Sequence, residues 1–241
     1  MLLDHFHPPL SDSRDWHGFH TQWAAVLAAD LNRRLPEGWW AQPEVIYGVE
    51  LDVGVVEEAD GPLQQPKPND DLADWTAPPP DMVVSFDIDD ESVEIQVLNS
   101  GYGPSLMAAI ELVSSSNKDR PATREAFVAK CLSILNDGAG LMVVDIVTAR
   151  HAALHHELLR RLGGRVAPAN TDLCASTFQV TEGADGEPEL RIWQEPLSVG
   201  ASLPILPLWL RIGPMFPIDL QRTYLTACEQ LKIKARTPLT V

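Results

Sequence analysis

Two strongly apolar segments with one helix-length segment between them constrain the fold of this chain more than any other feature. Residues 106–113 and 141–147 are almost continuously apolar, as expected for strands of a parallel sheet that is covered on both faces. The segment between them predicts a helix, with Asp119 as its cap and Pro121 in its first turn. Such a unit forms a right-handed crossover, and α/β sheets bind ligands at the carboxyl ends of parallel strands. The sequence therefore predicts an α/β fold with a site beside Glu111.

Further helices and strands are predicted on both sides of this unit. Over residues 14–35, apolar side chains recur at three- and four-residue steps, which predicts a first helix. Runs rich in β-branched residues predict strands at residues 44–49, 51–56, 82–86, 93–97, 173–181 and 189–193. Helices are also predicted over residues 152–162 and after Asp219, which can cap the last one.

The length of 241 residues suits one large domain, and we interpret residues 1–241 as a single domain. Residues 60–80 are acidic and rich in proline, which predicts an irregular surface loop, and residues 196–241 predict an extended arm followed by a helix. No stretch reaches the roughly 18 apolar residues that a membrane-spanning helix needs, so no membrane partner is expected. Three widely spaced cysteines without a CxxC pair predict free thiols and a cytoplasmic location.

The net charge of −16 is distributed unevenly along the chain. Residues 50–94 contain fourteen acidic side chains and only one base, whereas residues 118–165 are rich in lysine and arginine. An acidic surface repels a phosphate backbone, so tight nonspecific binding of a nucleic-acid duplex is disfavoured. The basic segment is either an ordinary solvated face or a basic rim beside the Glu111 turn. Nucleic acid and a second copy of the chain both stay open as partners.

Two carboxylates are candidates for a metal site. Asp81 opens one predicted strand and Glu111 closes another, so both could bind one Mg²⁺ if the two strands are neighbours in the sheet. Glu44, from the first strand, is a candidate for a further ligand or base. In the alternative interpretation, Asp81 caps a turn after prolines and Glu111 forms an ion pair with a lysine.

Lys130 lies beside the apolar stripe of the predicted helix that follows Glu111, where an ammonium group must reach solvent or meet a buried carboxylate. Glu111 is the expected partner, in either a catalytic or a purely structural pair. Asn117, Lys118 and Arg124 line the turn and the start of the helix, where N–H groups and basic side chains favour anions; a simple capped turn is the alternative. The histidines show no HExxH pattern, so no metal role is expected for them.

Several segments resemble an uncharacterised bacterial family, domain of unknown function 4058. The resemblance rests on Trp-His-Gly-Phe-His at residues 16–20, Leu-Asn-Arg-Arg-Leu-Pro at 31–36 and Ile-Glu-Leu-Val-Ser-Ser-Ser-Asn-Lys at 110–118. Residues 124–130, 143–146 and 203–208 look similar as well. This family looks related to the PD-(D/E)XK nuclease-like superfamily, which includes the Uma-type putative endonucleases. The resemblance therefore implies a restriction-endonuclease-like αβββαβ core with a mixed sheet, extended here by C-terminal strands and a helix.

The resemblance also implies the roles of the site residues. In that superfamily an Asp opening one strand and a Glu on the next strand bind the metal, and Asp81 and Glu111 match these positions. A Lys two residues after the Glu is usual, but that position is Val113 here. In the Uma-type relatives a lysine on the following helix replaces it, and Lys130 fits that description. The implied cofactor is Mg²⁺ or Mn²⁺.

Two functions follow from these expectations. The first is a metal-dependent phosphodiester hydrolase with Asp81, Glu111 and Lys130 as catalytic residues. The second is a catalytically inactive nuclease-like fold that serves as a binding or assembly module. The retained acids and Lys130 favour the first function, whereas Val113 and the acidic surface favour the second.

Overall fold

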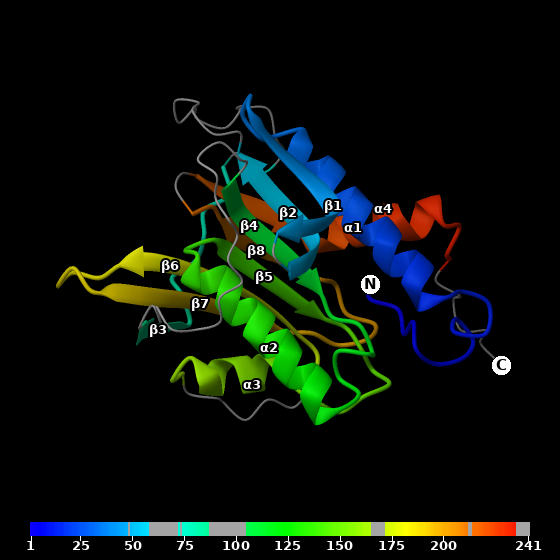
Figure 1. Ribbon diagram of the computed structural model, residues 1–241. Helices are drawn as coiled ribbons and strands as arrows, with labels where there is room; N and C mark the ends of the chain where they lie inside the picture. Colours follow the sequence, from blue (N-terminus) through cyan, green and yellow to red (C-terminus); the bar gives the residue numbers. More distant parts are fainter. Residues whose placement is uncertain are drawn as a thin grey trace.

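The computed structural model describes residues 1–47, 49–57, 72, 74–86, 105–164, 172–211 and 214–234. Within these residues the protein is a mixed α/β fold (Figure 1). The helices are α1 (Trp16–Asn32), α2 (Pro121–Asn136), α3 (Leu154–Arg161) and α4 (Leu220–Gln230). The strands are β1 (Trp39–Tyr47), β2 (Val49–Glu57), β3 (Met82–Ser85), β4 (Ser105–Leu112), β5 (Gly140–Asp145), β6 (Cys174–Glu182), β7 (Pro188–Pro196), β8 (Ile205–Trp209) and β9 (Met215–Asp219).

The described strands form a seven-stranded mixed sheet, in the order β1-β2-β4-β5-β6-β7-β3, and a separate β8–β9 pair. The predicted strand–helix–strand unit is confirmed, because β4 and β5 pair in parallel and α2 connects them. The other pairs in the seven-stranded sheet are antiparallel. In the parallel pair Glu111 lies beside Val143, one residue before the carboxyl end of β4.

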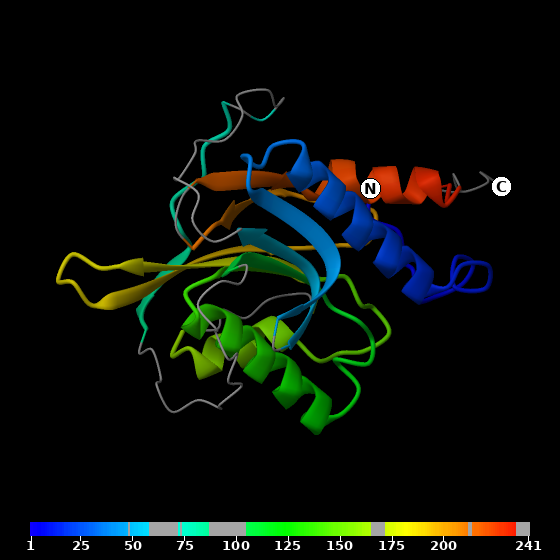
Figure 2. The ribbon, with the colours of Figure 1, turned by 45° about the horizontal axis from the view of Figure 1, so that its top comes forward.

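Helices cover both faces of the large sheet. Figure 2 shows α1 and α4 on one face and α2 and α3 on the other, and each face has its own hydrophobic core. Successive side chains of a strand point to opposite faces. Ile110 and Leu112 belong to the core under α1, whereas Ala109 and Val113 belong to the core under α2. Glu111 therefore points to the face that α2 covers.

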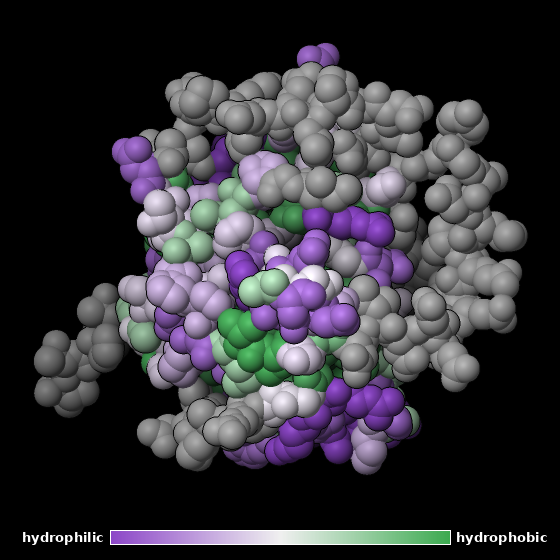
Figure 3. All heavy atoms as spheres, turned by 90° about the vertical axis from the view of Figure 1, so that its left-hand side faces the viewer, coloured by the Kyte–Doolittle hydropathy of each residue, from purple (hydrophilic) through white to green (hydrophobic). Residues whose placement is uncertain are grey.

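At its far edge the large sheet ends with the short strand β3. Met82 and Val84 of β3 are partly buried against the core under α2, whereas Val83 is 49% exposed. On the side of the molecule that carries β3 and the β6–β7 hairpin, apolar side chains gather between hydrophilic areas (Figure 3).

The expected C-terminal strands and helix are present, and the segment predicted as an extended arm contains β8 and β9, which pair as an antiparallel hairpin. Pro207 and Pro217 face each other in it. A two-stranded sheet tolerates proline because each strand has an edge that needs no donor. The predicted strand at residues 93–97 and most of the acidic segment 60–80 lie outside the described residues.

The three cysteines are buried and form no disulfide, as predicted. In the described part of the chain no helix combines the length and apolar character needed to cross a membrane.

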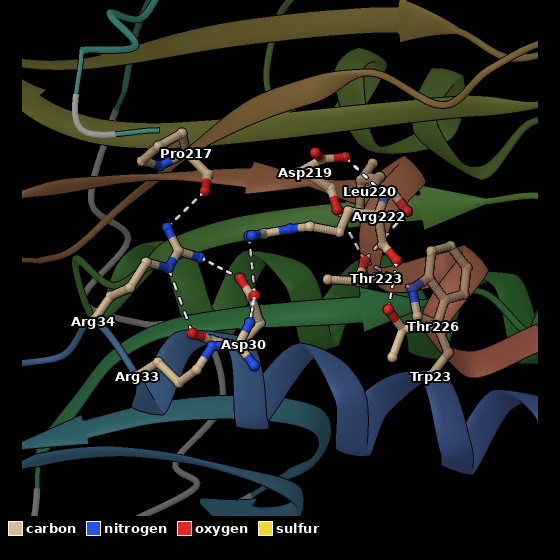
Figure 4. Close-up of polar contacts among 10 residues, drawn as sticks. All are labelled: Trp23, Asp30, Arg33, Arg34, Pro217, Asp219, Leu220, Arg222, Thr223 and Thr226. Atoms are coloured by element: carbon tan, nitrogen blue, oxygen red, sulfur yellow. Dashed lines mark hydrogen bonds and ion pairs between the residues drawn. The ribbon is translucent and has the colours of Figure 1, made fainter. Parts of the chain in front are cut away.

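A buried ion-pair network holds α1 against the C-terminal elements (Figure 4). Asp30 of α1 is 3% exposed and binds Arg33 and Arg34, while Arg222 of α4 contacts the same carboxylate at 3.0 Å. Arg34, itself 4% exposed, also donates to the backbone oxygen of Pro217 in β9 at 2.8 Å. The network therefore fixes the position of α1 relative to α4 and β9.

We expect Asp30→Ala to lower the free energy of unfolding by about 3–5 kcal/mol, because it leaves Arg34 buried without its counter-charge. Denaturant unfolding monitored by circular dichroism measures this loss. Asp12→Ala, at an exposed position before α1, is the control and should change stability by less than about 0.5 kcal/mol. Equal effects of the two substitutions would show that the network contributes nothing.

Candidate functional site

A pocket of about 540 Å³ lies at the carboxyl end of β4, between α1 and α2. Its volume lies in the range of small-molecule binding sites. The pocket is lined by Trp16, His17, His20, Thr21 and Ala24 of α1, Asp52 of β2, Glu111 and Leu112 of β4, Ser114, Ser116 and Asn117 of the following turn, and Thr123, Ala126, Phe127 and Lys130 of α2. This is the position that the sequence predicts for a site.

Glu111 is the most deeply buried acid of this pocket, with 1% of its surface exposed. Its Oε2 accepts a hydrogen bond from Lys130 Nζ, so the predicted Glu111–Lys130 contact is present. Its Oε1 is buried and has no hydrogen-bond partner among the described residues. A buried carboxylate oxygen without a partner is costly, and such an atom in a pocket marks a place where a ligand can bind.

The pKa values of Glu111 and Lys130 are set by two opposing effects: burial, which disfavours both charges, and the attraction between the two charges, which favours them. Burial raises the pKa of Glu111 to about 8, Lys130 acts against that rise, and the nearby charge of Asp52 adds to it. Burial alone would lower the pKa of Lys130, but the Glu111 carboxylate and Asp52 raise it overall. Lys130 therefore carries its positive charge at neutral pH, beside a carboxyl group that binds its proton unusually tightly.

Asp52 is the second carboxylate of the pocket, and sequence reasoning missed it. The antiparallel register pairs Val53 of β2 with Ile110 of β4, so Asp52 stands opposite Glu111. Asp52 Oδ2 accepts a hydrogen bond from the backbone N–H of Leu112 at 2.7 Å. The sequence does contain one indication of Asp52, which is an acid inside a strand of β-branched residues. Only the β2–β4 register, however, shows that Asp52 faces Glu111.

His20 adds a third polar group, from α1. Its Nε2 lies 2.9 Å from the backbone oxygen of Leu112 and 3.4 Å from Asp52 Oδ1. Burial lowers the pKa of His20, but the hydrogen bond and charge of Asp52 outweigh burial and raise it overall. No role was expected for this histidine, because nothing in the sequence of α1 indicates that its first turns approach β2 and β4.

The placement of Asp81 corrects the predicted metal pair. Asp81 precedes β3, and three strands separate β3 from β4 in the sheet. At about 4.8 Å per strand step the two positions are about 19 Å apart, far beyond Mg–O distances of about 2.1 Å. Asp81 Oδ2 instead accepts from the backbone N–H of Gln194 at 2.7 Å. Asp81 and Glu111 therefore do not share an ion in this structure.

Lys118 is also not placed as predicted. It is 2% exposed, and its Nζ lies 2.9 Å from Asp145 Oδ2 and 3.2 Å from the backbone oxygen of Val147. This pair ties the turn after β4 to the end of β5, so the Lys118 ammonium is bound by Asp145 within the core, although the residue borders a second pocket.

The remaining predicted residues lie at different places. Asn117 does line the pocket, and its Oδ1 accepts from the N–H and the hydroxyl of Ser114 at 2.9 and 2.8 Å. Arg124 faces a separate pocket and donates to Glu157 at 3.0 Å. Glu44 lies in β1, with its side chain outside the described part of the structure.

Within the described ranges, no group of three or more His, Cys, Asp and Glu side chains is arranged to hold a metal ion. No protein-family model, curated protein or solved structure matches this chain.

We expect Lys118→Met to lower the free energy of unfolding by about 3–5 kcal/mol, because Asp145, 1% exposed, is left buried without its cation. The double variant Lys118→Met/Asp145→Asn should be less destabilised than the sum of its single variants. Arg120→Met is the control, since its side chain is 78% exposed. If Lys118→Met kept the wild-type Tm, the buried Lys118–Asp145 pair would not contribute to stability, and Lys118 would be available to bind substrate.

Proposed function

We propose that this protein is a metal-dependent phosphodiester hydrolase of the PD-(D/E)XK nuclease-like type, in which Asp52 and Glu111 are the metal-binding carboxylates. One observation carries the proposal: the unpartnered, buried Oε1 of Glu111 lies in a pocket that also contains Asp52 and Lys130. Asp52 takes the role that the sequence had suggested for Asp81, because it occupies the strand next to Glu111.

The order of the elements supports this proposal. Taken without β3, the chain runs α1, β1, β2, β4, α2, β5, which is the αβββαβ order of a restriction-endonuclease-like core. The strands of that core are consecutive neighbours in the sheet, in the order β1-β2-β4-β5. On this view β3 and the adjoining segments are an insertion between the second and third core strands.

The chemistry of the donors fits Mg²⁺ or Mn²⁺. Asp52 and Glu111 offer carboxylate oxygens, and the backbone oxygen of Leu112 borders the same pocket and meets His20. Hard cations of this kind bind through one or two carboxylates together with waters. When bound, the ion activates water and neutralises negative charge that develops on a phosphoryl oxygen.

The side chains of the pocket have separate tasks in this proposal. In the reaction, water adds to phosphorus and the bond to the leaving oxygen breaks, which yields a phosphomonoester and an alcohol. The Lys130 ammonium stabilises the charge of the phosphoryl group and holds Glu111 in place. His20 positions Asp52 and the Leu112 carbonyl from the side of α1.

The second candidate function is an inactive nuclease-like fold that serves as a binding module. The observation that favours it is that Lys130 and His20 already contact Glu111, Asp52 and Leu112. Contacts of this kind also occur in a polar cluster that only stabilises the fold and binds no metal. The two candidates share one pocket and differ in whether it turns over a substrate.

We expect wild-type protein to hydrolyse bis(p-nitrophenyl) phosphate with Mn²⁺ or Mg²⁺, and Glu111→Gln and Asp52→Asn each to reduce the rate by about 100-fold or more. Glu111→Gln keeps the shape of the side chain and removes its ability to ionise and bind a metal as a carboxylate. Metal should also stabilise the folded state, by about 2.7 kcal/mol at a concentration 100 times Kd.

Asp81→Asn is the matched control, because it removes an acid at the far edge of the same sheet. It should keep the wild-type rate. Absence of both metal-dependent hydrolysis and metal-dependent stabilisation in the wild type would reject the hydrolase and favour the binding module.

A further inference from the structure

A second pocket, of about 590 Å³, opens on the other side of the turn that follows β4. Asn117 and Thr123 line the first pocket, whereas their neighbours Lys118 and Arg124 line the second. The two pockets are therefore separated only by the turn and the first residues of α2. A ligand that occupies both pockets has to pass over this turn.

Arginines from three separate elements converge on the second pocket. Arg124 comes from α2, Arg150 from the segment after β5 and Arg160 from α3. His151 and His156 line the pocket as well. On a chain with a net charge of −16, these arginines give the pocket guanidinium donors that suit an anionic group.

Three carboxylates, Asp119, Glu157 and Asp172, line the pocket as well, but their contacts leave most of the guanidinium donors available. Arg124 meets Glu157 through Nε at 3.0 Å, and Arg150 meets Asp119 through Nη2 at 3.2 Å. The backbone oxygen of Arg160 accepts from the N–H of Gly163 at 3.3 Å, whereas its guanidinium makes no hydrogen bond or ion pair with another described residue. A guanidinium carries five N–H donors in a planar fork that matches phosphate oxygens. The ion pairs thus orient the arginines without saturating them.

We infer that the second pocket binds a phosphate of a single-stranded nucleic acid whose neighbouring phosphodiester lies in the first pocket. The inference rests on the proposed hydrolase function and names the substrate class of that site. Arg124, which the sequence suggested as substrate-binding, acts in this second pocket, together with Arg150.

The structure favours a single strand over a duplex for two reasons. Glu111 is 1% exposed, so the reacting phosphodiester has to enter the pocket between α1 and α2, which a flexible strand does more easily. A duplex would also bring a second phosphate backbone against a chain with a net charge of −16. A short flexible strand needs only the guanidinium donors of the second pocket.

The test measures binding of a short, fluorescein-labelled single-stranded DNA by fluorescence anisotropy, in the Glu111→Gln background so that nothing is cleaved. We expect Arg124→Gln/Arg150→Gln to raise Kd by about tenfold or more. The slope of log Kd against log salt concentration should fall by about 1.4, because each phosphate contact to a single strand contributes about 0.7. The same DNA annealed to its complement should bind more weakly than the single strand.

The control is Arg191→Gln/Arg211→Gln, which makes the same change in net charge at residues that line neither pocket. It should keep the affinity of the parent protein. Equal weakening by both double variants, tighter binding of the duplex, or no binding of the single strand would each overturn the inference. If binding were arginine-dependent but the wild-type protein showed neither metal-dependent hydrolysis of bis(p-nitrophenyl) phosphate nor metal-dependent stabilisation, the phosphate pocket would stand and the hydrolase would be rejected.

Discussion

The parallel pairing of β4 with β5 is the constraint on which the rest of the structure depends. Two parallel neighbours cannot be joined by a tight turn, so the chain has to cross over through α2. That crossover places Lys130 over the end of β4 and brings its ammonium to Glu111. It also sets the turn after β4 between two pockets, each lined by residues of that turn and of α2.

The second half of the site depends on α1, which is far from β4 in the sequence. The Asp30 network and the contact of Trp23 Nε1 with Thr223 fix α1 against α4. With α1 held there, His20 reaches Asp52 and the Leu112 carbonyl at the end of β4. The polar groups of the pocket thus come from two helices, two strands and the turn after β4, and their positions depend on packing at a distance from the pocket.

Sequence reasoning succeeded where the controlling interactions are local. The apolar runs of β4 and β5 and the proline at the start of α2 are short-range patterns, so the unit and the approach of Lys130 to Glu111 could be predicted. The predicted cap was wrong by one residue, because Arg120 and not Asp119 is the N-cap of α2. The prediction that Asp81 lies beside Glu111 failed, because the residues of one strand do not show which strands are its neighbours in the sheet. Sequence reasoning also failed for Lys118, because an ammonium in the core is stable only beside Asp145, a partner supplied by tertiary packing.

The sequence by itself determined that this chain forms an α/β structure, with a carboxylate at the end of a parallel strand and a lysine on the crossover helix. Periodicity and capping depend on neighbours within a few residues, so they can be read directly. Only the tertiary structure decided that Asp52 and His20 join Glu111. The β2–β4 register and the docking of α1 result from burying side chains against distant partners. For that reason no local pattern marks them.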